Sequence, residues 1–252
     1  MTARPHLHRS DIRPDTHPGI VHLALAVGGF AIGTTEFASM SLVPYFAPDL
    51  GIDIPTAGHV ISAYALGVVF GAPLIAVLFA RTPRRTLLVG LMALFALANG
   101  LSGLAPSYRW MLLFRFLSGV PHGAYFGVAM LVAASLVPFG QRTQAAARVL
   151  LGLTVATIVG VPLASWLGLA VGWRWGFGLV ALLALLTALL VRIYAPHHAP
   201  GEGASPLKEL GALKNRQVWL TLAIGAIGFG GLFAVYTYLA NTLLEVTRVG
   251  PE

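Results

Sequence analysis

Seven long apolar blocks dominate the sequence. They occupy residues 20–43, 57–79, 86–105, 109–137, 146–171, 175–194 and 217–241. A helix needs about 20 apolar residues to cross the hydrocarbon of a bilayer, and each block approaches or exceeds that length. Only 10% of the residues are charged, whereas soluble domains average about 25%. We therefore predict an all-α polytopic membrane protein.

Basic residues gather in alternate connections between the blocks. Most of the 16 Lys and Arg residues lie before the first block or after the second, fourth and sixth. Basic loops stay on the cytoplasmic side of a membrane, so the pattern predicts a cytoplasmic N-terminus in a cell (inner or plasma) membrane. The net charge of +7 is then a topology signal, with the lipid bilayer as partner and no nucleic acid.

One connection is much longer than the others. Residues 195–216 begin Ala-Pro-His-His-Ala-Pro-Gly-Glu-Gly, which is typical of a polar linker. Transporters built from two six-helix halves share this layout. We predict a cytoplasmic tail over residues 1–19, a six-helix half over 20–194, a cytoplasmic linker over 195–216, and a seventh transmembrane helix with an outer end over 217–252.

Two formal charges interrupt the apolar blocks, Glu36 and Arg115. A charge at membrane depth costs about 2.5–3.5 kcal/mol on insertion scales, so one that persists usually serves a function. At 1.5 Å per residue, both lie roughly 9–11 Å below the outer boundary. One interpretation is a proton-carrying carboxylate governed by Arg115; the other is a static ion pair that fixes helix packing. His122, two helical turns from Arg115, is a proton relay or a hydrogen-bonded interior histidine.

Aromatic residues of the seventh block follow a helical spacing. Phe229, Phe233 and Tyr236 fall at i, i+4 and i+7, with Asn241 beyond. Such a stripe lines a substrate cavity or packs against a neighbouring helix. Tyr64 and Tyr125 are weaker cavity candidates, because each phenol needs a partner when buried.

Small residues and prolines mark predicted helix contacts. Glycines spaced four apart form a smooth stripe along which another backbone approaches closely. Prolines kink helices or end them. We predict packing roles for Gly67, Gly71, Gly119, Gly123, Gly127, Gly160 and Pro162.

A Gly-Leu-Ser-Gly segment around Ser102 has the form found in intramembrane serine proteases. Catalysis would also need a base within hydrogen-bond reach, and His122 is the one deep histidine. Chance is the preferred explanation. The sequence contains no cysteine, so disulfides and Cys-based metal sites are excluded, and we predict no metal and no cofactor.

Several segments together resemble the efflux proteins of the major facilitator superfamily. Residues 33–37, Gly-Thr-Thr-Glu-Phe, and residues 62–67, Ser-Ala-Tyr-Ala-Leu-Gly, are similar to its first two spans. The similarity is closest to the drug:proton antiporter branch, which includes arabinose efflux permease-like and chloramphenicol-resistance exporters. It continues through residues 42–44, 49–51, 71–73, 115–123, 160–164 and 173–177.

This resemblance implies a transporter, not an enzyme. It implies proton-coupled efflux of a small organic molecule such as a drug or sugar, with the proton as coupling ion and Arg115 linked to proton transfer. Arg81, Arg84 and Arg85 stand where the family has its cytoplasmic gating loop. Ala80 replaces the aspartate usual there, which departs from the family's charge relay.

Family members have twelve spans, whereas this sequence predicts seven. Alternating access needs two halves around a midplane site. We therefore expect a fragment or truncated product that is inactive alone and lacks a C-terminal half. Alternatives are a sugar exporter or uniporter without proton coupling, and a seven-helix receptor or sensor. The receptor is disfavoured because the seventh block has no lysine to hold retinal and the predicted N-terminus is cytoplasmic.

Overall fold

A computed structural model of the chain describes residues 17–197, 211 and 214–246. Every element that it assigns within these ranges is a helix, which confirms the predicted all-α class. In chain order they are α1 (Pro18–Ser41), α2 (Val43–Asp49), α3 (Ile54–Leu78), α4 (Arg84–Gly103), α5 (Tyr108–Ser135), η1 (Phe139–Gln141), α6 (Arg142–Val155), η2 (Ala156–Gly160), α7 (Val161–Ala170), α8 (Trp173–Tyr194) and α10 (Arg216–Glu245).

Seven helical stretches are long and apolar enough to cross a membrane. They match the seven predicted blocks within a few residues, except that the fifth begins at Phe139. It starts earlier because η1 and the polar first turn of α6 are already helical. The short α2 was not predicted. Pro44 occupies its first turn, where the missing N–H of proline costs nothing, so this proline begins a helix.

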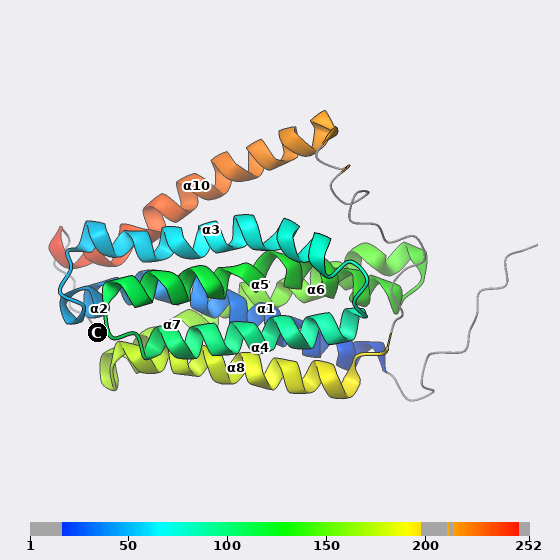
Figure 1. Ribbon diagram of the computed structural model, residues 1–252, viewed down its shortest axis with the longest axis horizontal. Helices are drawn as coiled ribbons and strands as arrows, with labels where there is room; N and C mark the ends of the chain where they lie inside the picture. Colours follow the sequence, from blue (N-terminus) through cyan, green and yellow to red (C-terminus); the bar gives the residue numbers. More distant parts are fainter. Residues whose placement is uncertain (1–16, 198–210, 212–213, 247–252) are drawn as a thin grey trace, which may run out of the picture.

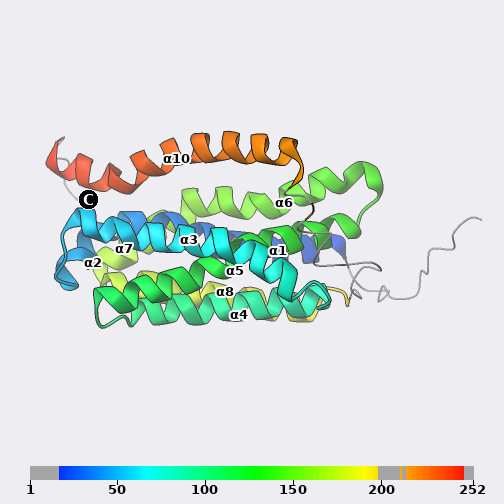
Figure 2. The ribbon, with the colours of Figure 1, turned by 45° about the horizontal axis from the view of Figure 1, so that its top comes forward.

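The helices of the first six spans lie side by side in one bundle, and α10 lies along its outside (Figures 1 and 2). Within the bundle α3 packs on α5, and α4 packs on α8. α10 contacts the bundle through α1. The interface of α1, α5 and the neighbouring α3 and α4 therefore forms the interior in which Arg115 is buried.

Glycines allow α3 and α5 to approach until their backbones touch. A Cβ added to Gly67 would lie 2.1 Å from the Phe116 carbonyl oxygen, and one on Gly119 would lie 2.1 Å from that of Tyr64. Gly71 and Gly123 face the same contact, since added Cβ atoms would lie 2.2 Å from the carbonyl oxygen of Val120 and 2.9 Å from the Cβ of Ala72. No described atom lies within 4 Å of a Cβ added to Gly127, so the predicted packing role of this glycine finds no support in the described bundle.

The fifth span changes its helical winding near its middle. η2 is a π-helical turn in which Val161 N–H donates to the Ala156 carbonyl. Pro162 follows in the first turn of α7 and is exposed. Because proline lacks the N–H that would continue the α-helical ladder, a change of winding beside it is expected. The turn places Gly160 against Thr34 of α1, 2.1 Å from an added Cβ to its Oγ1.

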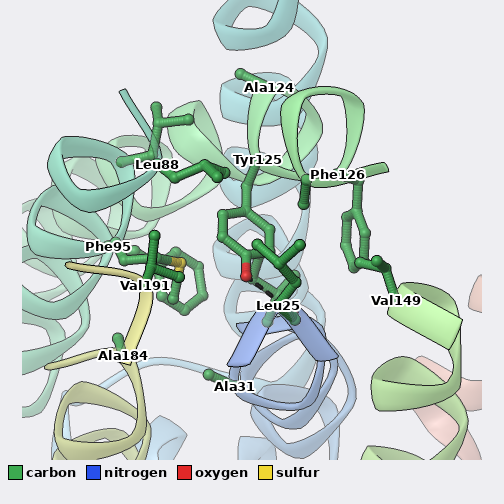
Figure 3. Packing of buried hydrophobic residues seen from close by; sticks show 14 of the residues in the cluster. Leu25, Ala31, Leu88, Phe95, Ala124, Tyr125, Phe126, Val149, Ala184 and Val191 are labelled. Atoms are coloured by element: carbon green, nitrogen blue, oxygen red, sulfur yellow. Dashed lines mark hydrogen bonds between the residues drawn. The ribbon is translucent and has the colours of Figure 1, made fainter. Parts of the chain in front are cut away.

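Tyr125 anchors the hydrophobic core between α1, α4, α5 and α8 (Figure 3). Its side chain is fully buried, and its hydroxyl donates a 2.8 Å hydrogen bond to the Leu25 carbonyl. Phe95 and Val191 belong to the same cluster. The prediction that Tyr125 lines a substrate cavity is therefore wrong, because its phenol finds the required partner inside the core.

Candidate functional site

The Arg115 side chain is completely buried at the interface of α1 and α5. One terminal nitrogen donates to Thr35 Oγ1 at 3.1 Å and to Ser118 Oγ at 3.5 Å, and the other donates to Ser39 Oγ at 3.2 Å. Thr35 and Ser39 are four residues apart, so α1 presents both hydroxyls on one face. The guanidinium carbon also lies 4.3 Å from the centre of the Tyr64 ring, a favourable cation–π geometry.

Asn99 of α4 extends this network. Thr35 Oγ1 accepts from Arg115 and donates its own hydrogen to Asn99 Oδ1 at 2.7 Å. The Asn99 amide nitrogen then donates to the Phe95 carbonyl at 2.8 Å. Each group in this chain of hydrogen bonds donates to the next, from Arg115 to the Phe95 carbonyl, and this fixes the orientation of each group. Sequence analysis missed Asn99, although a lone Asn in an apolar span is a recognisable signal of an interhelical hydrogen bond.

Tyr64 connects Arg115 to His122. The Tyr64 hydroxyl lies 2.8 Å from His122 Nδ1, and its ring lies under the guanidinium. Three residues that were singled out separately from the sequence are therefore in direct contact. The arrangement links the buried cation of α5 to an imidazole two turns along the same helix.

Glu36 lies beside this network without joining it. Its side chain is half-buried, and among the described residues its carboxylate has neither a hydrogen bond nor an ion pair. The interpretation of Glu36 and Arg115 as a static ion pair is therefore wrong. Glu36 is turned by about 100° from Thr35 around α1, so the neighbouring hydroxyls reach the guanidinium instead.

The aromatic stripe of α10 meets α1 at the residue after Glu36. Phe37 stacks on Phe233 with ring centres 5.7 Å apart, and it meets Tyr236 edge-on at 5.3 Å. Phe229 is exposed. The Asn241 side chain lies outside the described part of the structure. α10 thus covers α1 next to the unpaired carboxyl group.

Of the three arginines after the second span, one makes hydrogen bonds to α8 and its end, and the other two are partly or fully exposed. Arg85 Nη1 lies 2.7 Å from His197 Nδ1, and Nη2 donates to the Arg192 carbonyl. These bonds join the start of α4 to the end of α8. Arg84 is partly exposed and Arg81 is exposed, and a gating role for this loop stays a prediction.

Asp49 forms a second charged site at the opposite end of the bundle. It pairs with Arg174 and accepts a 2.9 Å hydrogen bond from Trp173 Nε1. The hydrogen bonds from Arg174 and then Trp173 hold the pKa of this carboxyl below its usual value. The pair ties α2 to the start of α8.

In the part of the chain that the structure describes, Ser102 has no catalytic partner. Its hydroxyl is buried and donates to the Ala98 carbonyl at 2.8 Å, while His122 is bonded to Tyr64. The protease alternative therefore has no support. Among the residues that the structure describes, no three His, Asp or Glu side chains gather as they would to hold a metal ion.

Comparison with known proteins gives a consistent result. The sequence profile described as Major Facilitator Superfamily matches residues 25–250. Inner membrane transport protein YdhP of Escherichia coli (strain K12) is 43% identical over 229 residues, which cover 91% of this chain and 59% of that protein. The chloramphenicol resistance protein of Streptomyces lividans is 38% identical over 230 residues, with 90% and 59% covered.

A solved structure shares the fold. The crystal structure of a bacterial homologue of the human lysosomal transporter Spinster, in an inward-facing and occupied conformation, matches with a TM-score of 0.71 at 18% identity. The match covers 95% of this chain and 57% of that chain. The chain thus spans somewhat more than half the length of the proteins that it matches.

Proposed function

Because the chain belongs to the major facilitator superfamily, we propose that it supplies the proton-coupling half of an exporter of small organic molecules. The family consists of transmembrane transporters, which supports a transporter and not an enzyme. One relative is named for chloramphenicol resistance, which supports a drug-like substrate. The proposed transporter lies in the cell membrane with its N-terminus in the cytoplasm, as the arginine pattern predicts.

The unpaired Glu36 carboxyl beside a fixed Arg115 carries the proposal. A carboxylate in an ion pair must break that pair to take up a proton, whereas Glu36 has no partner to lose among the described residues. Arg115 stays in place through Thr35, Ser39 and the Tyr64 ring. Intramembrane carboxylates of this kind mark proton routes.

Protonation of Glu36 changes the electrostatics of the α1–α5 interface. It removes a negative charge close to a cation that the surrounding hydroxyls hold in place. The two conformations of a transporter respond differently to that change, so proton uptake shifts the balance between them. In this proposal His122, reached through the Tyr64 hydroxyl, relays the proton towards the middle of the membrane.

A chimera tests the proposal: residues 1–252 joined to the second half of the E. coli relative and reconstituted in liposomes. We expect Glu36→Gln to abolish proton movement coupled to export, because glutamine keeps the shape but cannot titrate. Asp49→Asn is the matched control, since it neutralises a carboxyl outside the network. Unchanged pH-dependent export by the Glu36→Gln chimera would refute the proposal. Export by the unaltered chimera without proton movement would favour a uniporter.

A further inference from the structure

The end of the bundle at which α4 begins and α8 ends, on the right in Figure 1, carries positive charge. Residues 54–201 contain no Asp or Glu. Asp49 and Asp53 lie at the opposite end, where α2 ends and α3 begins. The described part of this basic end thus offers positive charge and no negative charge. Its arginines include Arg81, Arg84, Arg142 and Arg192.

Phe139 has the largest exposed fraction, 83%, of the large apolar side chains that the structure describes. It follows Pro138 and begins η1, in the connection between α5 and α6. No atom of the described chain lies within 4 Å of a Cβ added to the next residue, Gly140, so the space beside the ring is open. A ring that stays in water loses the free energy of apolar burial. We therefore expect an apolar group from outside the described chain to cover it.

Phe139 lies where the bilayer changes from hydrocarbon to headgroups. It begins a membrane-crossing stretch of 32 residues, Phe139–Ala170, whereas about 20 residues cross the hydrocarbon. The excess lies at the start of the stretch, because Gln141, Arg142 and Thr143 are polar. Aromatic residues with neighbouring Lys or Arg are typical of helices at this level of a membrane. The depth of the ring therefore indicates that lipid covers it.

Arg142 lies over the Phe139 ring, with its guanidinium carbon 5.3 Å from the ring centre. Residues three apart share a helix face, so the ring and the cation lie on the same side. The Arg142 side chain is exposed, and within the described ranges its guanidinium has no hydrogen-bond acceptor. A planar guanidinium binds phosphate through two parallel hydrogen bonds. The two side chains thus present an apolar surface and phosphate donors at one level of the membrane.

We propose that Phe139 and Arg142 bind the headgroup region of an anionic phospholipid. Arg142 donates to the phosphate, and Phe139 lies against the glycerol and the first methylenes of the acyl chains. The other arginines of the basic end favour an anionic headgroup over a zwitterionic one, since basic side chains near the surface attract anionic lipids. A soluble phosphate would satisfy Arg142 but would leave the ring in water. The binding does not depend on proton coupling at Glu36.

Native mass spectrometry of the full 252-residue chain in detergent tests the site, because it resolves each bound lipid molecule. The probes are a phosphatidylglycerol and a phosphatidylcholine with the same acyl chains. We expect the first phosphatidylglycerol to bind at least about fivefold more tightly than the first phosphatidylcholine. Glycerol 3-phosphate at the same concentration should not displace it, because it lacks the acyl chains.

Variants separate the two parts of the site. Arg142→Gln should lower the affinity for the first phosphatidylglycerol about fivefold and leave phosphatidylcholine nearly unchanged. The matched control is Arg81→Gln, which removes the same charge from the same end at a residue without a described aromatic partner. It should retain most of the phosphatidylglycerol affinity. Phe139→Ala should weaken the binding of both lipids, and Phe139→Trp should preserve it, since Trp suits this level of the membrane. Circular dichroism confirms that each variant is folded.

Equal affinities of the unaltered chain for the two lipids would overturn the proposal. Equal losses in Arg142→Gln and Arg81→Gln would mean a diffuse attraction to the whole basic end and would also overturn it. Displacement by glycerol 3-phosphate would assign the site to a soluble phosphate instead of a lipid. Glu36→Gln should leave lipid binding unchanged, so a failure of the proton-coupling proposal is distinguished from a failure of this one.

Discussion

Arg115 and Arg174 show two ways in which this chain holds an arginine. Arg174 is 45% exposed and pairs with the carboxylate of Asp49. Arg115 is fully buried and is held by three hydroxyls and the Tyr64 ring. Glu36 lies in the same turn of α1 as Thr35, and its carboxylate has no ion-pair partner among the described residues. Within the same described ranges, the exposed arginine has a carboxylate partner and the buried arginine does not.

The difference separates a structural contact from a functional one. An exposed ion pair contributes about 0–1 kcal/mol and ties two elements together. A buried ion pair has a large desolvation cost and must be broken before its carboxyl can titrate. Neutral hydroxyls hold Arg115 without binding the carboxyl. The comparison therefore predicts large functional effects at the buried site and small ones at the exposed site.

Among the variants that compare these two regions, the largest effect is expected from Arg115→Lys. An ammonium keeps the charge but cannot reach Thr35 and Ser39 together as the planar fork of arginine does. Losing hydrogen bonds from a charged group should lower coupled export of the chimera about ten- to a hundredfold. The paired control is Arg174→Lys, which should retain most of the export. Equal losses in the two variants would remove the distinction between the two arginines.

A smaller effect is expected from Gly119→Ala. The new Cβ would press on the Tyr64 carbonyl and push its ring away from Arg115. Overpacking of this kind costs about 1–3 kcal/mol, measurable as reduced thermal stability of the chain in detergent. Gly127→Ala should change stability by less than about 0.5 kcal/mol, because open space surrounds Gly127. Similar losses of stability in Gly119→Ala and Gly127→Ala would contradict the close contact between α3 and α5.

The hydrogen bond between Thr35 and Asn99 should give an effect of intermediate size. Thr35→Val removes the oxygen that joins Arg115 to Asn99 while keeping the side-chain shape. A double-mutant cycle with Asn99→Leu should give an interaction energy of about 0.6–1.7 kcal/mol, as for other interhelical hydrogen bonds in membranes. Unfolding of the solubilised chain provides the measurement. Strict additivity would mean that the Thr35–Asn99 bond contributes nothing.

The smallest effect is expected from Asp49→Asn. The pKa of Asp49 in the folded protein is lowered, chiefly by the hydrogen bond from Arg174. The pair therefore stabilises the fold above the unfolded value of about 3.9, and this contribution disappears as the pH falls through the folded pKa. Melting curves of the unaltered chain and of Asp49→Asn should be compared from about pH 7 to about pH 2. At neutral pH the unaltered chain should melt at a slightly higher temperature than the variant, and in acid the two melting temperatures should be equal. A difference that persists in acid would refute this assignment.

Sequence patterns predicted the spans well because hydrocarbon thickness constrains each one. The same patterns identified Glu36, Arg115, Tyr64 and His122, since polar groups are conspicuous in apolar blocks. They could not show which groups touch. Depth along a helix suggested that Glu36 pairs with Arg115, but rotation about α1 brings Thr35 to the arginine instead. The prediction for Tyr125 was wrong because its partner, the Leu25 carbonyl, is a backbone atom 100 residues away, and a sequence pattern does not reveal such a contact.

Infrared titration of the chain in detergent tests the central claim most directly, because a protonated carboxyl and a carboxylate absorb at different frequencies. We predict a carboxyl band that forms and disappears reversibly with pH while the protein stays folded. This band should be absent in Glu36→Gln and unchanged in Asp49→Asn. An identical set of bands in Glu36→Gln and the unaltered chain would show that Glu36 does not exchange its proton, and would contradict the account.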